Sequence, residues 1–295
     1  MKKIFLGALY CLVLSTSANA QKKLVENAIL WKVSGKGLQK PSYIFGTYHF
    51  LTNSFVDTLP EVLNAYKAAG MVVGELIIDS SIQAPLMKAQ MLSGTTLQKI
   101  LPDTVYARTA GWFKEEAGLD LIQLNQLNPI TVMTFAMAVT KQKYFPNKKG
   151  EVQLDTYFQD MGKKEGKKIK GLETIDVQIN ALFNQLTMAR QIELLNDALK
   201  DKEGLKNAIT VMNEAYFKND LVGLQNLMYG ASYKPGELKA LIDDRNNSWI
   251  QQLPPLMKDQ SLFVAVGALH LVGESGLVKQ LREQGYTLTP VNLKN

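Results

Sequence analysis

The sequence is poor in the side chains that most often build redox and nucleophilic sites. Among its 295 residues are one cysteine, Cys11, and two histidines. Because we expect Cys11 to lie in a removed N-terminal segment, the rest of the chain forms no disulfide and offers no thiol nucleophile. An oxidising compartment would therefore be tolerated but not exploited.

Several catalytic motifs are also absent. The sequence contains no G-x-S-x-G nucleophile elbow, no H-E-x-x-H zinc motif and no glycine-rich phosphate loop. These absences argue against a serine hydrolase of the elbow type, a zincin and a nucleotide-dependent enzyme. Whatever chemistry the protein performs must be sought in other side chains.

Beyond the N-terminus, no hydrophobic run reaches the length of a membrane span. The nearest is 127–139, which contains Asn128, Pro129 and two threonines and predicts a core helix. The run 4–14 is shorter still. It follows Lys2 and Lys3 and precedes Ala18-Asn19-Ala20.

This N-terminal order of basic, apolar and small residues is typical of an export signal. We expect residues 1–20 to be a signal peptide cleaved after Ala20, and residues 21–295 to form a single domain. Tyr10 stands before Cys11, where a lipid-anchored precursor would have a small residue. The sequence thus predicts a periplasmic or secreted protein with no stable membrane anchor after cleavage.

The net charge of the precursor is +6, and part of the excess lies in one cluster of lysines. Lys163, Lys164, Lys167, Lys168 and Lys170 form it, and no aromatic residue lies between them. A nucleic-acid surface combines basic and aromatic side chains. We therefore expect a solvated helix end and no nucleic-acid partner.

The hydrophobic pattern predicts strands at both ends of the chain and helices between them. We expect strands at 28–33 (an edge strand), 42–45, 71–78, 168–172, 261–266 and 286–291. Helices are expected at 57–69, 95–101, 103–117, 128–141, 152–164, 177–199, 205–218, 220–228, 237–253 and 276–284. The prolines at 254 and 255 are expected to end the helix before them. The fold class is α/β, with one sheet built from βαβ-like segments at both ends and a large helical insertion over about 95–255.

The two histidines occur in matching contexts. His49 ends Gly46-Thr47-Tyr48-His49 after one predicted strand, and His270 ends Gly267-Ala268-Leu269-His270 after another. In an open parallel sheet, the loops at the carboxyl ends of the strands line the ligand site. If the two strands are adjacent, two imidazoles meet there as metal ligands or as a general base.

Three further side chains are candidates for the same site. Glu75 follows the apolar run 71–74, where a carboxylate needs a cation or another partner. Arg245 and Asn246 lie on a predicted helix, and an arginine can hold a carboxylate or an oxyanion. Glu173 follows the short predicted strand 168–172 and is either a further site carboxylate or a charge at a helix N-terminus.

The order of these motifs resembles the TraB/GumN family from about 28 to 293. The resemblance is carried by the segments from Gly46 to His49, Gly74 to Glu75 and Gly171 to Thr174, by Arg245-Asn246 with Trp249, and by the segment from Gly267 to Leu271 with the closing Gly285-Tyr286. That family is similar to the Tiki proteases of animals and, more distantly, to erythromycin esterases and haem-binding ChaN-like proteins.

The resemblance implies a metal-dependent, peptidase-like site with a peptide or protein substrate. His49, Glu75 and His270 would be its catalytic and metal-binding core, with Arg245 and Asn246 in a second tier. Manganese or cobalt would be the active ion, with zinc as an alternative. The pair Thr47-Tyr48 is bulkier than in many members, which bears on the shape of the pocket.

Two other functions fit the same residues. The histidines can bind haem or a metal without turnover, as the ChaN resemblance implies. One histidine can also act as the general base of a metal-free, esterase-like hydrolase. The sequence names neither a substrate nor an oligomeric state.

Overall fold

A computed structural model describes residues 27–230 and 233–294 of the chain. The expected export signal, its cleavage after Ala20 and Cys11 lie outside the described residues. Within them, we find no helix with the length and apolar character needed to cross a membrane.

A six-stranded mixed sheet supports the site. Its strands are β1 (Leu30–Ser34), β2 (Ser42–Thr47), β3 (Met71–Gly74), β4 (Lys168–Gly171), β5 (Leu262–Gly267) and β6 (Thr287–Pro290). They lie in the order β4-β3-β5-β2-β1-β6. The four strands β4, β3, β5 and β2 are mutually parallel, while β1 pairs antiparallel with both of its neighbours. The predicted α/β class is confirmed, with both ends of the chain contributing to one sheet.

The first strand differs from its prediction. We expected an edge strand, but β1 lies between β2 and β6. Leu30 and Val33 are fully buried and Trp31 almost so. The sequence-distant β6 supplies the outer neighbour, and nothing in the local pattern of β1 could indicate that pairing.

Helices cover the sheet and extend beyond it. The α-helices are α1 (Asn53–Asp57), α2 (Pro60–Ala68), α3 (Gln83–Gln90), α4 (Leu97–Ile100), α5 (Asp103–Ala117), α6 (Pro129–Tyr144), α7 (Leu154–Lys164), α8 (Ile175–Ile179), α9 (Met188–Leu199), α10 (Gly204–Phe217), α11 (Leu221–Gly230), α12 (Pro235–Leu238), α13 (Asp244–Asp259) and α14 (Leu277–Glu283). Short 3-10 helices are η1 (Ser80–Ile82), η2 (Leu121–Leu124) and η5 (Ala268–Leu271), and π-helical turns are η3 (Asn180–Asn184) and η4 (Lys239–Asp243).

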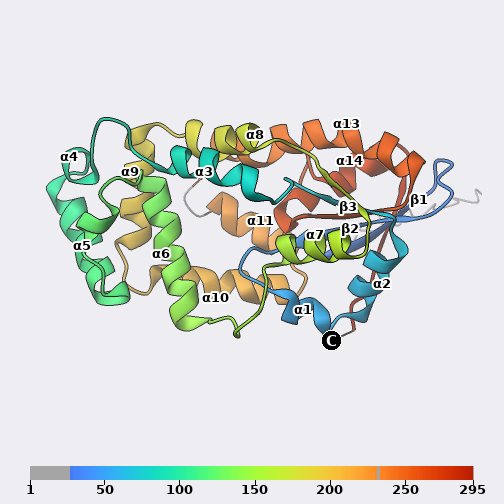
Figure 1. Ribbon diagram of the computed structural model, residues 1–295, viewed down its shortest axis with the longest axis horizontal. Helices are drawn as coiled ribbons and strands as arrows, with labels where there is room; N and C mark the ends of the chain where they lie inside the picture. The colour runs from blue at the N-terminus through green and yellow to red at the C-terminus, as the bar shows by residue number, and fades with distance from the viewer. Residues whose placement is uncertain (1–26, 231–232, 295) are drawn as a thin grey trace, which may run out of the picture.

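Two hydrophobic cores hold these helices in place. One surrounds the sheet and includes Phe45, Phe158, Phe263 and Trp249. The other lies among α4, α5, α6 and α9 and centres on residues such as Phe113. Figure 1 shows these four helices on one side of the molecule, with α13 and α14 on one face of the sheet and α7 and α2 on the other. The helical segment expected over 95–255 also returns to the sheet, because β4 pairs with β3 and α7 packs against it.

Two predicted helices are not continuous. The helix expected at 177–199 is divided into α8, the π-helical η3 and α9. The helix expected at 237–253 consists of α12, the π-helical η4 and α13, and α13 runs through Pro254 and Pro255 to Asp259. The prediction that these prolines end the helix is wrong. The helix forgoes their N–H groups, while Ile250, Leu253 and Met257 are buried along its inner face.

Candidate functional site

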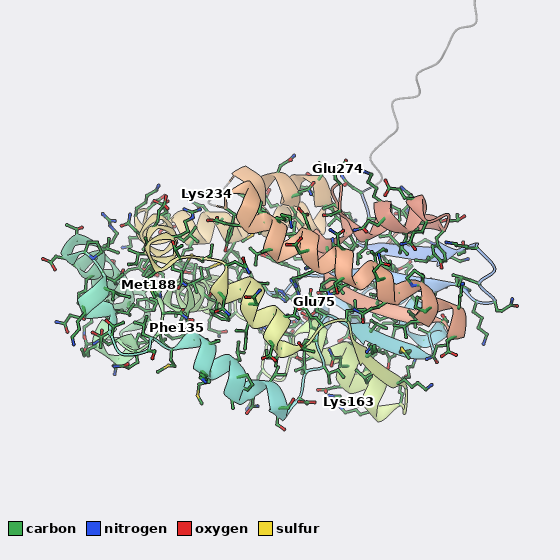
Figure 2. The ribbon with its side chains drawn as sticks, turned by 90° about the horizontal axis from the view of Figure 1, so that it is seen from above. Glu75, Phe135, Lys163, Met188, Lys234 and Glu274 are labelled. Atoms are coloured by element: carbon green, nitrogen blue, oxygen red, sulfur yellow. The ribbon has the colours of Figure 1, made fainter. Side chains whose placement is uncertain are left out.

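The four parallel strands deliver one candidate side chain each to the same edge of the sheet. His49 follows β2, Glu75 follows β3, Glu173 follows β4 and His270 follows β5. The strands β2 and β5 are adjacent, with Thr47 opposite Gly267. Because the carboxyl ends of parallel strands share one edge, residues 221 positions apart in sequence reach one place in space. Figure 2 shows Glu75 near the middle of the molecule, between the sheet and the helices that carry Phe135 and Met188.

Glycine at position 46 allows the loop after β5 to pack closely against β2 at this edge of the sheet. A Cβ added to Gly46 would lie 2.9 Å from the Cα of Ala268, which is backbone and cannot give way easily. The carbonyl of Gly46 accepts a 2.6 Å hydrogen bond from the Tyr216 hydroxyl. The loop after β5 can therefore pack directly on β2, and this contact sets the position of the segment that carries His270.

Arg245, in the first turn of α13, contacts most of the buried side chains of the site. Its Nε and Nη2 donate to the two oxygens of Glu173 at 2.9 and 2.8 Å, and Nη2 also donates to Glu75 Oε2 at 2.5 Å. Its Nη1 faces the Leu241 carbonyl at 3.0 Å and His270 Nε2 at 3.1 Å. All five N–H donors of the guanidinium are thus engaged. The guanidinium lies over the ring of Trp249, whose indole N–H donates to Glu173.

Asn246, the residue after Arg245, fixes the tautomer of His270. Its Nδ2 donates to the carbonyls of His270 and Ser275, both at 3.0 Å. Its Oδ1 must therefore face His270 Nδ1, at 2.7 Å, and accept a hydrogen bond from the N–H there. The lone pair of the His270 ring is left on Nε2, where it accepts a hydrogen bond from Arg245.

The charges of Glu75 and His270 follow from this arrangement. Burial opposes the ionised form of Glu75, whereas His270, which is protonated at the low pH where Glu75 titrates, and Arg245 favour it, and the pKa of Glu75 falls to about 2. The N–H of Gly267 also donates to Glu75 Oε1 at 2.8 Å. Burial lowers the pKa of His270 to about 4, against the pull of Glu75. At neutral pH, Glu75 is therefore a carboxylate and His270 a neutral imidazole.

His49 belongs to a second, more open part of the site. Its Nδ1 lies 3.0 Å from Oδ2 of Asp155, and the Thr47 hydroxyl donates to the other oxygen of Asp155 at 2.8 Å. Asp155 lies in the first turn of α7. The hydrogen bond to Asp155 raises the pKa of His49 above its ordinary value. With the Nδ1 proton directed to Asp155, the Nε2 of a neutral His49 is free for a ligand or a proton.

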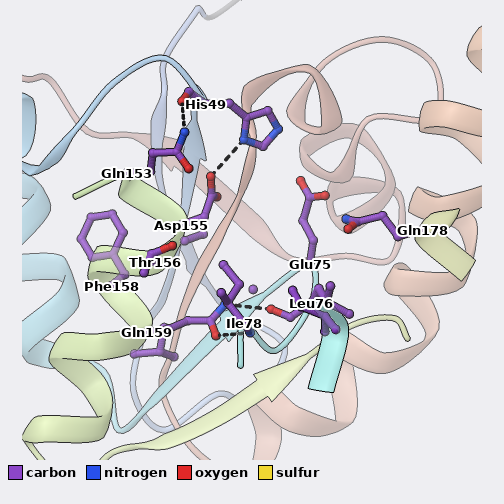
Figure 3. A pocket seen from close by; sticks show the side chains of 14 residues that line it. His49, Glu75, Leu76, Ile78, Gln153, Asp155, Thr156, Phe158, Gln159 and Gln178 are labelled. Atoms are coloured by element: carbon purple, nitrogen blue, oxygen red, sulfur yellow. Dashed lines mark hydrogen bonds and ion pairs between the residues drawn. The ribbon is translucent and has the colours of Figure 1, made fainter. Parts of the chain in front are cut away.

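A cavity of about 250 Å³ connects His49 with Glu75. Its walls also include Asp155, Gln153 and Gln178 (Figure 3). Gln153 donates to the His49 carbonyl at 3.2 Å. Gln178, on α8, lies on the Glu75 side of the cavity (Figure 3), and within the described part of the chain its carboxamide has no hydrogen bond. This cavity is where a small group could meet both a histidine and a carboxylate.

The predicted site residues divide into two groups. Glu75, His270, Arg245, Asn246 and Glu173 are joined by direct contacts, whereas His49 meets Glu75 only across the cavity. Sequence reasoning missed Asp155 and Gln178. Both lie on helices more than 100 residues from the motif of His49, and no local signal in the sequence connects them with it.

The metal prediction meets an obstacle in the present arrangement. In the described ranges 27–230 and 233–294, no three His, Cys, Asp or Glu side chains are grouped closely enough to hold a metal ion. Glu75 Oε1 lies 3.8 Å from His270 Nε2, but the guanidinium of Arg245 contacts both residues. The donor types suit a divalent metal, yet an arginine side chain occupies the cation position.

Comparison with known proteins gives a consistent result. A sequence model of the TraB/PrgY/gumN family matches residues 29–290. The chain is 24% identical to metalloprotease TIKI2 of Danio rerio over 88% of this chain and 60% of the relative. It is 25% identical to the metalloprotease TIKI homolog of Nematostella vectensis, over 88% and 66% of the two chains, and 22% identical to human metalloprotease TIKI1, over 88% and 61%.

The matches leave part of each relative uncovered. The chain spans about 60% of the length of the TIKI2 protein. No solved structure matches the chain significantly.

Proposed function

Because this chain belongs to the TraB/PrgY/gumN family, we propose that it is an exported hydrolase of the peptidase kind. The relatives it resembles are named metalloproteases, which supports hydrolysis of peptide bonds in this chain as well. The observation that carries the proposal is the cavity shared by His49 and Glu75 at the carboxyl ends of parallel strands. It supports the proposal because a histidine, the usual proton-transfer side chain, faces a carboxylate with a lowered pKa across the cavity.

In this proposal, His49 moves the proton. Its Nε2 takes a proton from water as the water attacks the scissile carbonyl, and returns it to the leaving amine. Asp155 holds the imidazole in the required tautomer and stabilises the imidazolium that forms, since it contacts Nδ1 at 3.0 Å. Thr47 orients Asp155 in turn. Thr47, a member of the pair Thr47-Tyr48 that precedes the histidine, thereby has a positioning role.

Two polar side chains across the cavity from His49, Glu75 and Gln178, bind the water and the substrate in this proposal. The carboxylate of Glu75 orients the attacking water, and the free carboxamide of Gln178 donates a hydrogen bond to the oxygen of the scissile carbonyl as negative charge develops on it. Arg245 fixes the position of Glu75 by a hydrogen bond. Asn246 fixes the ring of His270, which in turn contacts Arg245. These buried residues act through Glu75.

The metal-dependent form of the proposal adds one requirement. A divalent ion bound by His49, Glu75 and His270 would need the guanidinium of Arg245 to leave Glu75 and His270. Breaking a buried ion pair in this way costs about 3–5 kcal/mol. As they are arranged, the residues do not fit the ion, and the metal site with Mn²⁺ or Co²⁺ stays a prediction.

A cleavage assay tests the proposal. Chelator-treated wild-type protein and His49→Ala are incubated with a mixed peptide library, with and without added Mn²⁺, and new peptide termini are measured by mass spectrometry. We expect cleavage by wild type and a loss of about 10²- to 10⁴-fold in the variant. Cleavage that requires Mn²⁺ would support the metal-dependent form. Equal cleavage by the two proteins, or none by wild type in either condition, would refute the proposal.

A further inference from the structure

A second cavity lies beside the candidate site, and none of the predicted site residues lines it. It measures about 310 Å³ and lies among the start of α1, the end of α6, the loop that follows α6 and the helix α10. Its apolar wall includes Phe50, Phe145, Phe217 and Ile209. The cavity is therefore open to a ligand with an aromatic or aliphatic body.

The floor of this cavity contains a buried cation. Lys141 is only 8% exposed, and it forms no ion pair among the residues described in ranges 27–230 and 233–294. Its ammonium donates to the side-chain oxygen of Asn147. One acceptor leaves two of its three donors unused. Glu151 attracts this ammonium only from beyond ion-pair distance, and burial lowers the pKa of Lys141. A buried ammonium without a direct ion pair is costly, so the cavity favours a ligand that brings a negative charge into contact with it.

A second polar group in the wall of the cavity needs a hydrogen-bond donor, whereas Lys141 needs an acceptor. The Oδ1 atom of Asn213, on α10, is buried and has no hydrogen-bond partner among the described residues. Glu151 also lines the cavity, but its Oε2 already accepts from the Thr52 hydroxyl at 2.9 Å and from the Lys148 N–H at 3.0 Å. A fitting ligand thus presents an anion toward Lys141 and an N–H donor toward Asn213.

The two cavities are separated by one narrow partition. Thr52 and Gln153 form an isolated antiparallel bridge. Gln153 lines the cavity of His49, whereas Thr52 and Glu151 line the second cavity. Phe50, which follows His49 directly, also belongs to the second cavity. Residues adjacent in sequence, such as His49 and Phe50, therefore line different cavities.

We propose that this second cavity binds the C-terminal residue of a peptide. The terminal carboxylate pairs with Lys141, the amide N–H of the same residue donates to Asn213 Oδ1, and an apolar side chain packs among Phe50, Phe145 and Phe217. The choice of a peptide as ligand rests on the proposed function. The binding of a carboxylate with an apolar body rests on this cavity alone.

Isothermal titration with N-acetylphenylalanine tests the proposal, with its C-terminal amide and inorganic phosphate as comparisons. We expect wild type to bind the free acid at least about tenfold more tightly than the amide, because a charge-assisted hydrogen bond is lost in the amide. Lys141→Met and Asn213→Leu should each weaken binding of the acid about tenfold. Lys143→Met is the matched control on the same helix, and its binding should equal that of wild type.

The outcomes separate this cavity from the catalytic proposal. Binding of the acid by His49→Ala as by wild type supports the cavity, even if no peptide is cleaved. Three results would overturn it: no binding of the acid at millimolar concentration, equal binding of acid and amide, or phosphate binding as tight as that of the acid. Melting temperatures of the variants show whether each is folded, and the comparison of acid with amide in wild type needs no variant.

Discussion

At the scale of single residues, the site depends on which groups carry charge. Glu75 and Glu173 share the one guanidinium of Arg245, and His270 beside them is neutral. His49 is attached to a different carboxylate, Asp155, and its pKa moves in the opposite direction from that of His270. Pairs of titratable groups whose pKa values are driven apart are typical of acid–base sites. The two histidines thus differ in pKa because their neighbours differ.

Acid should weaken the fold through Glu75. Its pKa is lowered from 4.5 to about 2 in the folded protein, so its contribution to stability is complete above pH 4.5 and is lost as pH falls toward 2. We predict that the free energy of unfolding in urea falls less between pH 5 and pH 3 for Glu75→Gln than for wild type. Glu274→Gln, at a side chain that is 93% exposed, is the control and should behave as wild type. An identical decrease in all three proteins would contradict the assignment.

Removal of the guanidinium should be more damaging than removal of a surface arginine. Arg245→Met leaves two carboxylates in the site without their cation, which costs about 3–5 kcal/mol of folding free energy. Arg108→Met removes an exposed side chain that contacts Asn196, and should cost less than about 1 kcal/mol. Denaturant unfolding of both variants measures the difference. Equal losses would show that the contacts of Arg245 contribute little.

At the scale of elements, the fit between β2 and the segment after β5 depends on Gly46. Gly46→Ala would bring a Cβ to 2.9 Å from backbone, and we predict a loss of about 1–3 kcal/mol in stability. Gly111→Ala is the matched control, because Gly111 lies inside α5 with no atom within 4 Å of its added Cβ. That substitution should stabilise the protein by about 0.5–1 kcal/mol. Thermal melting distinguishes the two, and a neutral Gly46→Ala would contradict the close approach.

The sequence predicted the strands better than the helices around the site. Strands such as β5 are short apolar runs, so the presence of β2, β3 and β5 could be predicted locally. The strand expected at 71–78 was predicted too long, because β3 ends at Gly74 although the apolar residues continue through Ile78. The π-helical turns η3 and η4 could not, because 177–199 and 237–253 have uninterrupted helical patterns. Tertiary packing between these two turns overrides the local preference. Arg245 is the second residue of α13, which begins immediately after η4.

At the scale of the whole molecule, the sheet and the helical part meet at the cavity of His49 and Glu75. Two of its lining residues, Val72 and Ala265, lie on strands of the sheet. Two others, Phe158 and Gln178, lie on the helices α7 and α8. The position of α7 relative to β2, which gives His49 its partner Asp155, is set by the packing of Phe158 on Phe45 and Phe263. Such a contact across more than 100 residues is a property of the complete core, and single-sequence patterns do not reveal it.

The pH dependence of peptide cleavage tests the central claim, that His49 paired with Asp155 is the proton-transfer group. A base must be deprotonated to act, so kcat/KM of wild type should rise through a pKa above the value of about 6.5 for an ordinary histidine. Asp155→Asn removes the carboxylate that raises this pKa, and should move the rise to lower pH while lowering the maximum rate. A rise at the same pH in both proteins, or a rate that falls through this range, would contradict the claim.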